Sequence, residues 1–149
     1  MDDFSPPTGT NVYGLRQSDK NLPQPGKQPL SSMSPTIVLR DGKPIFVVGA
    51  SGGPRIISGV VQVILNHIWF DDEPIHAIKR PRLHHQWIPD KVYFEESWRD
   101  NHTVHSLQDK GHVTTSRHTV GVVQGIAIED GILKPASDPR KGGSALGVN

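Results

Sequence analysis

Residues 36–57 decide the fold, and they read TIVLRDGKPIFVVGASGGPRII. Two β-branched runs, Thr36–Leu39 and Pro44–Val48, flank the dipeptide Asp41-Gly42, which is a strong signal for a β-hairpin. Both runs are almost continuously apolar, a pattern typical of strands that are buried on both faces. The pair Gly52-Gly53 then precedes an apolar helix, so the sequence predicts a hairpin, a tight turn and a helix in immediate succession.

The residues after the hairpin predict an α+β chain whose sheet resumes towards the C-terminus, from residue 113 onward. Three- and four-residue spacing of apolar side chains indicates the helices, and short β-branched runs indicate the strands. The expected elements are a helix over residues 56–68, a helix over 74–80, a strand over 92–95, a helix over 100–110, and strands over 113–116, 120–128 and 132–133.

Composition limits the classes of function. The 149 residues are enough for one domain with a core, and 16 basic against 15 acidic residues argue against a nucleic-acid-binding surface. No apolar run approaches the length of a membrane span, and no cysteine is present to form a disulfide, a thiolate metal site or a thiol nucleophile. The hairpin needs cover on two sides, so the chain alone is expected to expose apolar surface and an unpaired strand edge.

A hydroxyl pair and a glycine pair suggest acyl-transfer chemistry. Ser31 and Ser32 precede the hairpin and could bind a carboxylate, although serines also cap turns locally. Gly52 and Gly53 would leave backbone N–H groups exposed at the positive end of the following helix, where anions and developing oxyanions are bound. A strand-to-helix turn also needs glycine for steric reasons, and both interpretations of the pair can hold together.

Four motifs in one order extend this interpretation: Met1-Asp2-Asp3-Phe4, Pro29–Thr36, Gly49–Ile56 and Ala136–Arg140. Together they closely resemble the small subunit of the γ-glutamyltransferases (γ-glutamyltranspeptidases, glutathione hydrolases), which are N-terminal-nucleophile hydrolases. The resemblance covers residues 1–140 and implies part of an αββα four-layer sandwich that is incomplete without upstream strands. Residues 141–149 are expected to form a flexible, glycine-rich tail.

The resemblance implies that the activity belongs to a larger assembly. Such enzymes transfer the γ-glutamyl group of glutathione or related amides to water or amino acids, through a Thr nucleophile freed by self-cleavage. That Thr should lie upstream of the Asp-Asp-Phe motif, and no Thr-Thr-His segment occurs in this sequence. The chain is therefore expected to be a substrate-pocket portion, inactive alone, whose partner is a large-subunit-like chain or an upstream segment of the same precursor. The alternative is a truncated, non-catalytic chain that acts as a binding or interaction module.

The resemblance also assigns roles to individual residues. Asp3 would bind the α-amino group of the γ-glutamyl substrate, and Ser31 and Ser32 its α-carboxylate. Gly52 and Gly53 would form the oxyanion hole.

The proline- and glycine-rich loop over residues 5–28 corresponds to a lid in the family, with Tyr13 as its shielding aromatic residue. The other interpretation of this loop is a mobile linker with an incidental tyrosine. Arg55 could bind an anion at the start of the same helix, but the expected role is a surface or interface ion pair.

The sequence contains eight histidines, which could in principle form a metal site, but their spacing does not support one. Neighbours such as His84-His85 point apart in an extended chain, and no His-x-x-x-His pattern accompanies them. We therefore expect neither a metal nor a cofactor. The segment Arg82–Trp87 resembles a family segment whose histidines are structural. The resemblance places such proteins in the periplasm or outside the cell.

Overall fold

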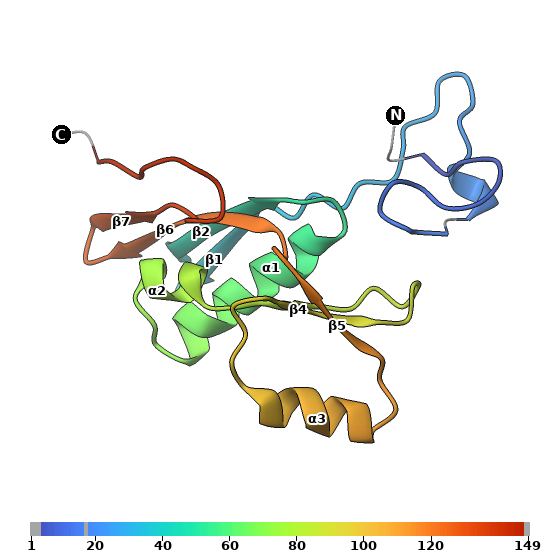
Figure 1. Ribbon diagram of the computed structural model, residues 1–149. Helices are drawn as coiled ribbons and strands as arrows, with labels where there is room; N and C mark the ends of the chain where they lie inside the picture. Colours follow the sequence, from blue (N-terminus) through green and yellow to red (C-terminus); the bar gives the residue numbers. More distant parts are fainter. Residues whose placement is uncertain (1–3, 17, 148–149) are drawn as a thin grey trace.

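The computed structural model describes residues 4–16 and 18–147, so the role expected for Asp3 lies outside the described residues. A four-stranded sheet with helices on one face forms the body, and a smaller sheet and a long N-terminal segment flank it (Figure 1). The elements are a 3₁₀ turn Asp19–Asn21, β1 Thr36–Arg40, β2 Lys43–Ser51, α1 Arg55–Ile64, a π-helical turn Leu65–Trp69, α2 Pro74–Lys79, β3 Leu83–His84, β4 Val92–Glu95, α3 Asn101–Asp109, β5 Thr114–Arg117, β6 Val122–Glu129 and β7 Ile132–Ala136.

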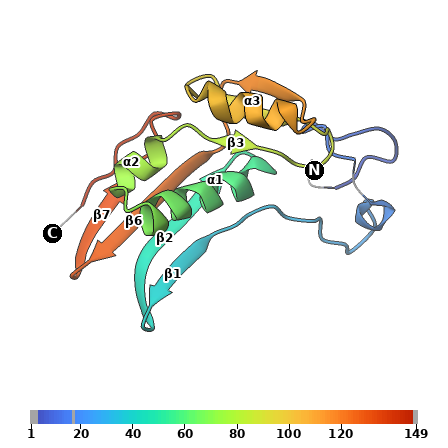
Figure 2. The same cartoon turned by 90° about the horizontal axis from the view of Figure 1, so that it is seen from below.

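The main sheet has the strand order β1-β2-β6-β7, and each neighbouring pair is antiparallel. Helices α1 and α2 lie on one of its faces, as Figure 2 shows. The core fills the space between that face and the two helices. Its fully buried members include Phe46 from β2, Val63 from α1, Ile78 from α2, and Val123 and Ala127 from β6.

The predicted hairpin and helices are present. Strands β1 and β2 are joined by Asp41 and Gly42 alone, and both have positive φ, as a two-residue hairpin turn requires. The helix expected over 56–68 begins at Arg55 and changes to the π-helical turn after Ile64. The other two helices match within one residue at each end.

The expectation that the sheet of the hairpin resumes at residues 113–116 is wrong, because the segment after α2 forms a sheet of its own. Strands β3, β4 and β5 form a separate sheet in that order, and β3 was not foreseen because two residues carry no periodic signal. Strands β4 and β5 pair in parallel, with α3 as the crossover between them. Helix α3 therefore lies at the end of the molecule away from the main sheet (Figures 1 and 2).

The second face of the main sheet carries no helix of the described residues. One row of paired positions crosses all four strands on this face: Ile37, Val47, Ile126 and Pro135. Val47 is 36% exposed, whereas its neighbour Val48, which points to the helices, is 3% exposed. The expectation of exposed apolar surface is therefore confirmed for this face.

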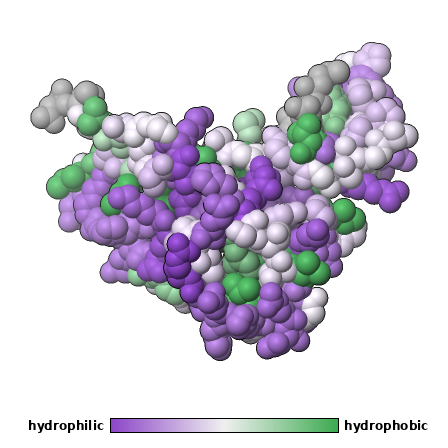
Figure 3. All heavy atoms as spheres, in the orientation of Figure 1, coloured by the Kyte–Doolittle hydropathy of each residue, from purple (hydrophilic) through white to green (hydrophobic). Residues whose placement is uncertain are grey.

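The N-terminal segment runs as a separate lobe beside the sheets (Figures 1 and 3). Ser5 donates its backbone N–H to the Asn21 carbonyl at 3.0 Å, and the Leu30 N–H is 2.9 Å from Oδ1 of Asn21. The predicted long loop thus closes on itself around one 3₁₀ turn. Seen from the side of Figure 1, the molecular surface is mostly hydrophilic, with small separate apolar patches (Figure 3).

Adjacent positions of β2 provide a test of the two faces. Val47→Lys should leave the isolated chain folded and lower its binding of the dye ANS and its self-association, because the charge enters the open face. Val48→Lys should prevent folding, because an unpaired ammonium would be buried among the core residues. Size-exclusion chromatography with light scattering, ANS fluorescence and circular dichroism measure these outcomes. Loss of structure in both variants would contradict the assignment of an open outer face.

Candidate active site

The predicted glycine pair forms the turn between β2 and α1, and its geometry admits only glycine. Gly52 has φ +135° and Gly53 has φ +61°. A Cβ atom at Gly52 would lie 3.0 Å from the Cα of Gly121, and one at Gly53 would lie 2.5 Å from Cζ of Tyr13. The backbone of Gly121 therefore leaves no room for a side chain at Gly52, and the Tyr13 ring leaves none at Gly53.

The start of α1 is available to an anion. Helix α1 begins at Arg55, and in the described part of the chain no side chain caps its N-terminus. The first N–H groups of a helix have no intrahelical partner, and they carry the positive end of the helix dipole. The turn can therefore present backbone donors to a carboxylate or to a developing oxyanion.

Tyr13 is brought to the glycine pair from the N-terminal lobe. Its ring lies against Gly53, and the guanidinium carbon of Arg55 is 5.6 Å from the ring centroid, which is a cation–π contact. The loop around Tyr13 is closed by Asn11, whose Oδ1 accepts from the N–H groups of Tyr13 and Leu15 at 3.0 Å. Tyr13 and Gly53, two predicted site residues that are 40 positions apart in the sequence, thus meet in space.

Arg55 makes an aromatic contact within this chain in place of a surface ion pair. Among the described residues it forms no ion pair, and its guanidinium lies over the Tyr13 ring instead. Burial and the nearby Arg117 lower the pKa of Arg55. Arg117 lies in the same way over Tyr93, 5.7 Å from that ring centroid. Two cations are therefore held on aromatic faces close to the glycine turn.

The two predicted serines lie just before β1, and no contact among the described residues joins them to the glycine pair. Oγ of Ser31 accepts from the backbone N–H of Met33 at 3.2 Å, which is a local turn, and its own hydroxyl proton is not used in that bond. Ser32 is half-buried and its carbonyl accepts from the Ser34 hydroxyl at 3.1 Å. The Ser34 hydroxyl is thus used by the backbone.

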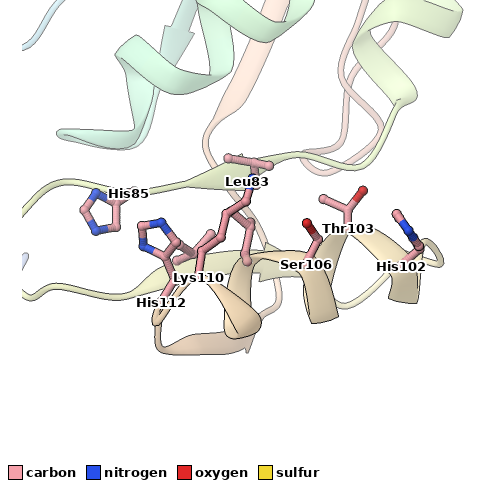
Figure 4. Close-up of a pocket in the computed structure, with 9 residues that line it drawn as sticks. Leu83, His85, His102, Thr103, Ser106, Lys110 and His112 are labelled. Atoms are coloured by element: carbon pink, nitrogen blue, oxygen red, sulfur yellow. The ribbon is translucent and has the colours of Figure 1, made fainter.

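A cavity beside α3 contains none of the predicted site residues. It measures about 650 Å³ and lies between α3 and the strands β3 and β4 (Figure 4). The rings of His85 and His112 lie 6.3 Å apart at one end, and His102 lies at the other end (Figure 4). These three imidazoles do not converge, and no group of three potential metal ligands occurs among the described residues.

Sequence reasoning missed a buried ionic cluster, which consists of Arg82, Glu95, Asp138 and Arg140. Nη2 of Arg82 is 2.7 Å from Oδ2 of Asp138, and both side chains are fully buried. Arg140 bridges Asp138 at 3.1 Å and Glu95, whose Oε1 lies 2.8 Å from Nε of Arg140. Arg140 and Asp138 belong to a motif that the sequence had singled out, but their partners are far away in the chain.

The ionic cluster is connected to the glycine turn through the backbone of Gly121. Nη1 of Arg82 donates to the carbonyls of Val120 and Gly121, each at 3.1 Å, and the Cα of Gly121 is the atom against which Gly52 packs. Gly121 itself has φ +69° and lies against the carbonyls of Ser51 and Arg55. The position of the glycine turn therefore depends on Arg82.

Asp138 is stabilised in its charged form. Burial alone would raise the pKa of Asp138, but N–H donors from Val123 and Arg140 and the Arg82 guanidinium together hold the pKa below its usual range. Because the folded pKa is depressed, the stabilisation is present above the ordinary Asp pKa and is lost as the pH falls through the folded value.

The family model described as Gamma-glutamyltranspeptidase matches residues 1–148. The chain belongs to the γ-glutamyltranspeptidase family.

Similar proteins support this membership. The chain is 45% identical over 142 residues to the glutathione hydrolase proenzyme of Escherichia coli, and the match covers 94% of this chain and 24% of the E. coli protein. It is 46% identical over 97 residues to an Arabidopsis thaliana protein named putative inactive glutathione hydrolase 4. That match covers 64% of this chain and 51% of the Arabidopsis protein. A mutant of the Helicobacter pylori γ-glutamyltranspeptidase has a TM-score of 0.88 and 39% identity, covering 94% of this chain and 78% of that one.

The structural match confirms the predicted fold class, that of the N-terminal-nucleophile γ-glutamyltranspeptidases. This chain spans about a quarter of the length of the E. coli relative. No helix of the described γ-glutamyltranspeptidase region has both the length and the apolar character needed to cross a membrane.

The contact between Tyr13 and Gly53 leads to a first prediction for the site. Gly53→Ala should displace the ring and expose Tyr13 to nitration by tetranitromethane, because the new methyl group would overlap the ring. Gly42→Ala is the matched control, since Gly42 has φ +76° and nothing within 4 Å. Each variant should lose about 1 kcal/mol through its left-handed backbone. Peptide mapping distinguishes Tyr13 from Tyr93, and equal Tyr13 nitration in both variants would contradict the contact.

The ionic cluster leads to a second prediction. Asp138→Asn should reduce the free energy of unfolding by about 3–5 kcal/mol, because the buried Arg82 loses its charged partner. Asp72→Asn, which breaks the exposed pair with Arg80, should cost less than about 1 kcal/mol. Urea denaturation measures both. The difference between wild type and Asp138→Asn should shrink below about pH 4, and a difference that does not change with pH would argue against this charge assignment.

Proposed function

We propose that this chain forms the γ-glutamyl-binding portion of a glutathione hydrolase, which transfers the γ-glutamyl group of glutathione or a related amide to water or an amino acid. The observation that carries the proposal is the closure of the Tyr13 ring over Gly53 at the uncapped start of α1. An anion-binding turn under an aromatic cover is an arrangement suited to acyl transfer, because it offers donors to an oxyanion and excludes water.

The chemistry divides between this chain and residues supplied from elsewhere. A Thr hydroxyl from the complementary segment attacks the γ-carbonyl carbon, and the carbonyl oxygen becomes an oxyanion facing the N–H groups of Gly52 and Gly53. Collapse of this intermediate breaks the γ-amide C–N bond. The leaving nitrogen takes up the proton that the Thr hydroxyl gave up, the amine departs, and a γ-glutamyl ester remains. Water or an amino group then attacks the ester and releases the product.

The head of the substrate would be bound by the serines and by the N-terminal motif. The Ser31 hydroxyl already accepts one N–H bond and keeps its proton to donate to the substrate α-carboxylate. Ser32, half-buried beside it, would supply a second donor. Asp3 would pair with the α-amino group, which needs an anionic partner.

A second candidate is a non-catalytic interaction module. Two observations favour it: one relative over 97 residues carries a name that describes it as inactive, and the outer face of the main sheet is apolar and open. The two candidates differ in whether a nucleophile segment restores turnover.

An assembled enzyme provides that test. We define it as the E. coli proenzyme in which residues of the present chain replace the matching 142 residues. The assembled enzyme should process itself and hydrolyse γ-glutamyl-p-nitroanilide, whereas the 149-residue chain alone should have no activity because it lacks the nucleophile. Correct processing without turnover would favour the interaction module.

Asp3 can be tested in the assembled enzyme against its neighbour. Asp3→Ala should lower kcat/KM for γ-glutamyl-p-nitroanilide by at least about tenfold, because loss of a desolvated charge partner costs about 2–5 kcal/mol. Asp2→Ala is the matched control and should change kcat/KM little. The same kinetic constants in both variants would remove Asp3 from the site.

A further inference from the structure

The side-chain amide of Gln86 connects the small sheet to the loop that carries Tyr13. Its Nε2 donates to the carbonyls of Tyr13 at 3.2 Å and Ile88 at 3.1 Å, and its Oε1 is 2.8 Å from Nε2 of His84. Carbonyl oxygens only accept hydrogen bonds, so the amide nitrogen must face them. The amide oxygen must then face His84.

This orientation fixes the state of His84. Since the Gln86 oxygen accepts, Nε2 of His84 carries the proton, and Nδ1 has a free lone pair in the neutral ring. Oγ of Ser58 is 2.8 Å from Nδ1 and therefore donates to it. His84 is 3% exposed, and its burial lowers its pKa, which favours this neutral form.

The hydrogen bonds thus form one directed chain from α1 to the N-terminal lobe. It runs from Ser58 on α1 through His84 on β3 and Gln86 to the backbone carbonyl of Tyr13. Helix α1 begins at the glycine turn, so the chain starts one helical turn from the turn that Tyr13 covers. Pro89 supports the same loop, because its ring lies beside Gly14.

We propose that Gln86 is a positioning residue, oriented by His84 and Ser58, which fastens the Tyr13 loop by its backbone so that the aromatic ring lies over Gly53. The ring contact alone leaves the loop free to pivot about the Tyr13 side chain. A second attachment at the Tyr13 carbonyl removes that freedom and sets the cover in one orientation.

The consequence for turnover rests on the proposed function. A fastened cover retains the γ-glutamyl group in the pocket and must open for exchange of substrate and product. Loosening the attachment should therefore raise KM for the γ-glutamyl donor more than it changes kcat, since Gln86 touches the loop and not the reacting atoms.

The test uses Gln86→Glu, which keeps the acceptor toward His84 and loses both donors. Gln62→Glu is the matched control: Nε2 of Gln62 also donates to two carbonyls, those of Ser58 and Leu83, but Gln62 does not contact the Tyr13 loop. Hydrogen exchange is followed in the assembled enzyme, in a peptide spanning residues 11–15 and in a β2 peptide as the reference for the fold. Exchange of the Tyr13 and Leu15 amides should become roughly tenfold faster in Gln86→Glu and stay unchanged in Gln62→Glu.

The other outcomes decide against the proposal. Unchanged exchange in Gln86→Glu, or the same acceleration in Gln62→Glu, would overturn it. If Gln86→Glu loses β2 protection, Gln86→Met replaces it, because methionine has the same length without a charge; loss of β2 protection in both would make Gln86 a residue of the fold alone. In the active enzyme, KM should rise roughly threefold or more with kcat nearly constant. The exchange result does not need turnover, so an inactive assembled enzyme with a loosened loop would refute only the proposed function.

Discussion

The carboxylate of Asp138, held by Arg82 and Arg140, is the interaction on which the placement of the site depends. Arg82 precedes β3 of the small sheet, whereas Asp138 follows β7 of the main sheet. The same guanidinium binds the carbonyl of Gly121, and Gly121 lies directly under the glycine turn. One ion pair therefore fixes how the two sheets meet and where the N–H groups of the turn point.

A buried ion pair is weak evidence for net stability, because desolvation of both charges offsets their attraction. Here the hydrogen bonds of Arg82 point to a different role, which is to fix one arrangement of the surrounding backbone. Arg82 donates to three backbone carbonyls, those of Ile78, Val120 and Gly121, as well as to Asp138, and only its Nε lacks a partner among the described residues. An apolar replacement could fill the volume but could not hold these carbonyls at defined positions.

The sequence predicted what short-range rules control and missed what long-range pairing controls. The Asp41-Gly42 turn, the start of α1 and the extents of α2 and α3 are controlled locally, and they were predicted. The small sheet was missed because β3 has two residues and β4 pairs with β5 across a helix. Gly53 and Tyr13 were named for the site through motifs, but nothing local indicated their contact. Arg82 and Asp138 are 56 positions apart, and an arginine between Pro81 and Leu83 gives no sign in the sequence that it is buried.

The site is therefore a property of the contact between the two sheets and of neither sheet alone. The main sheet supplies the glycine turn and α1, while the small sheet supplies His84 and, just after it, Gln86, which reaches the Tyr13 loop. A shift of one sheet against the other by about 1 Å would break hydrogen bonds of 2.8–3.2 Å, because such bonds weaken steeply with distance and angle. The ionic cluster prevents this shift from within the core. The cluster acts through Gly121, which lies against Gly52, and the loop attachment acts through Tyr13, whose ring lies against Gly53. The two restraints therefore reach adjacent residues of the same turn, one through charge and backbone and the other through an aromatic ring.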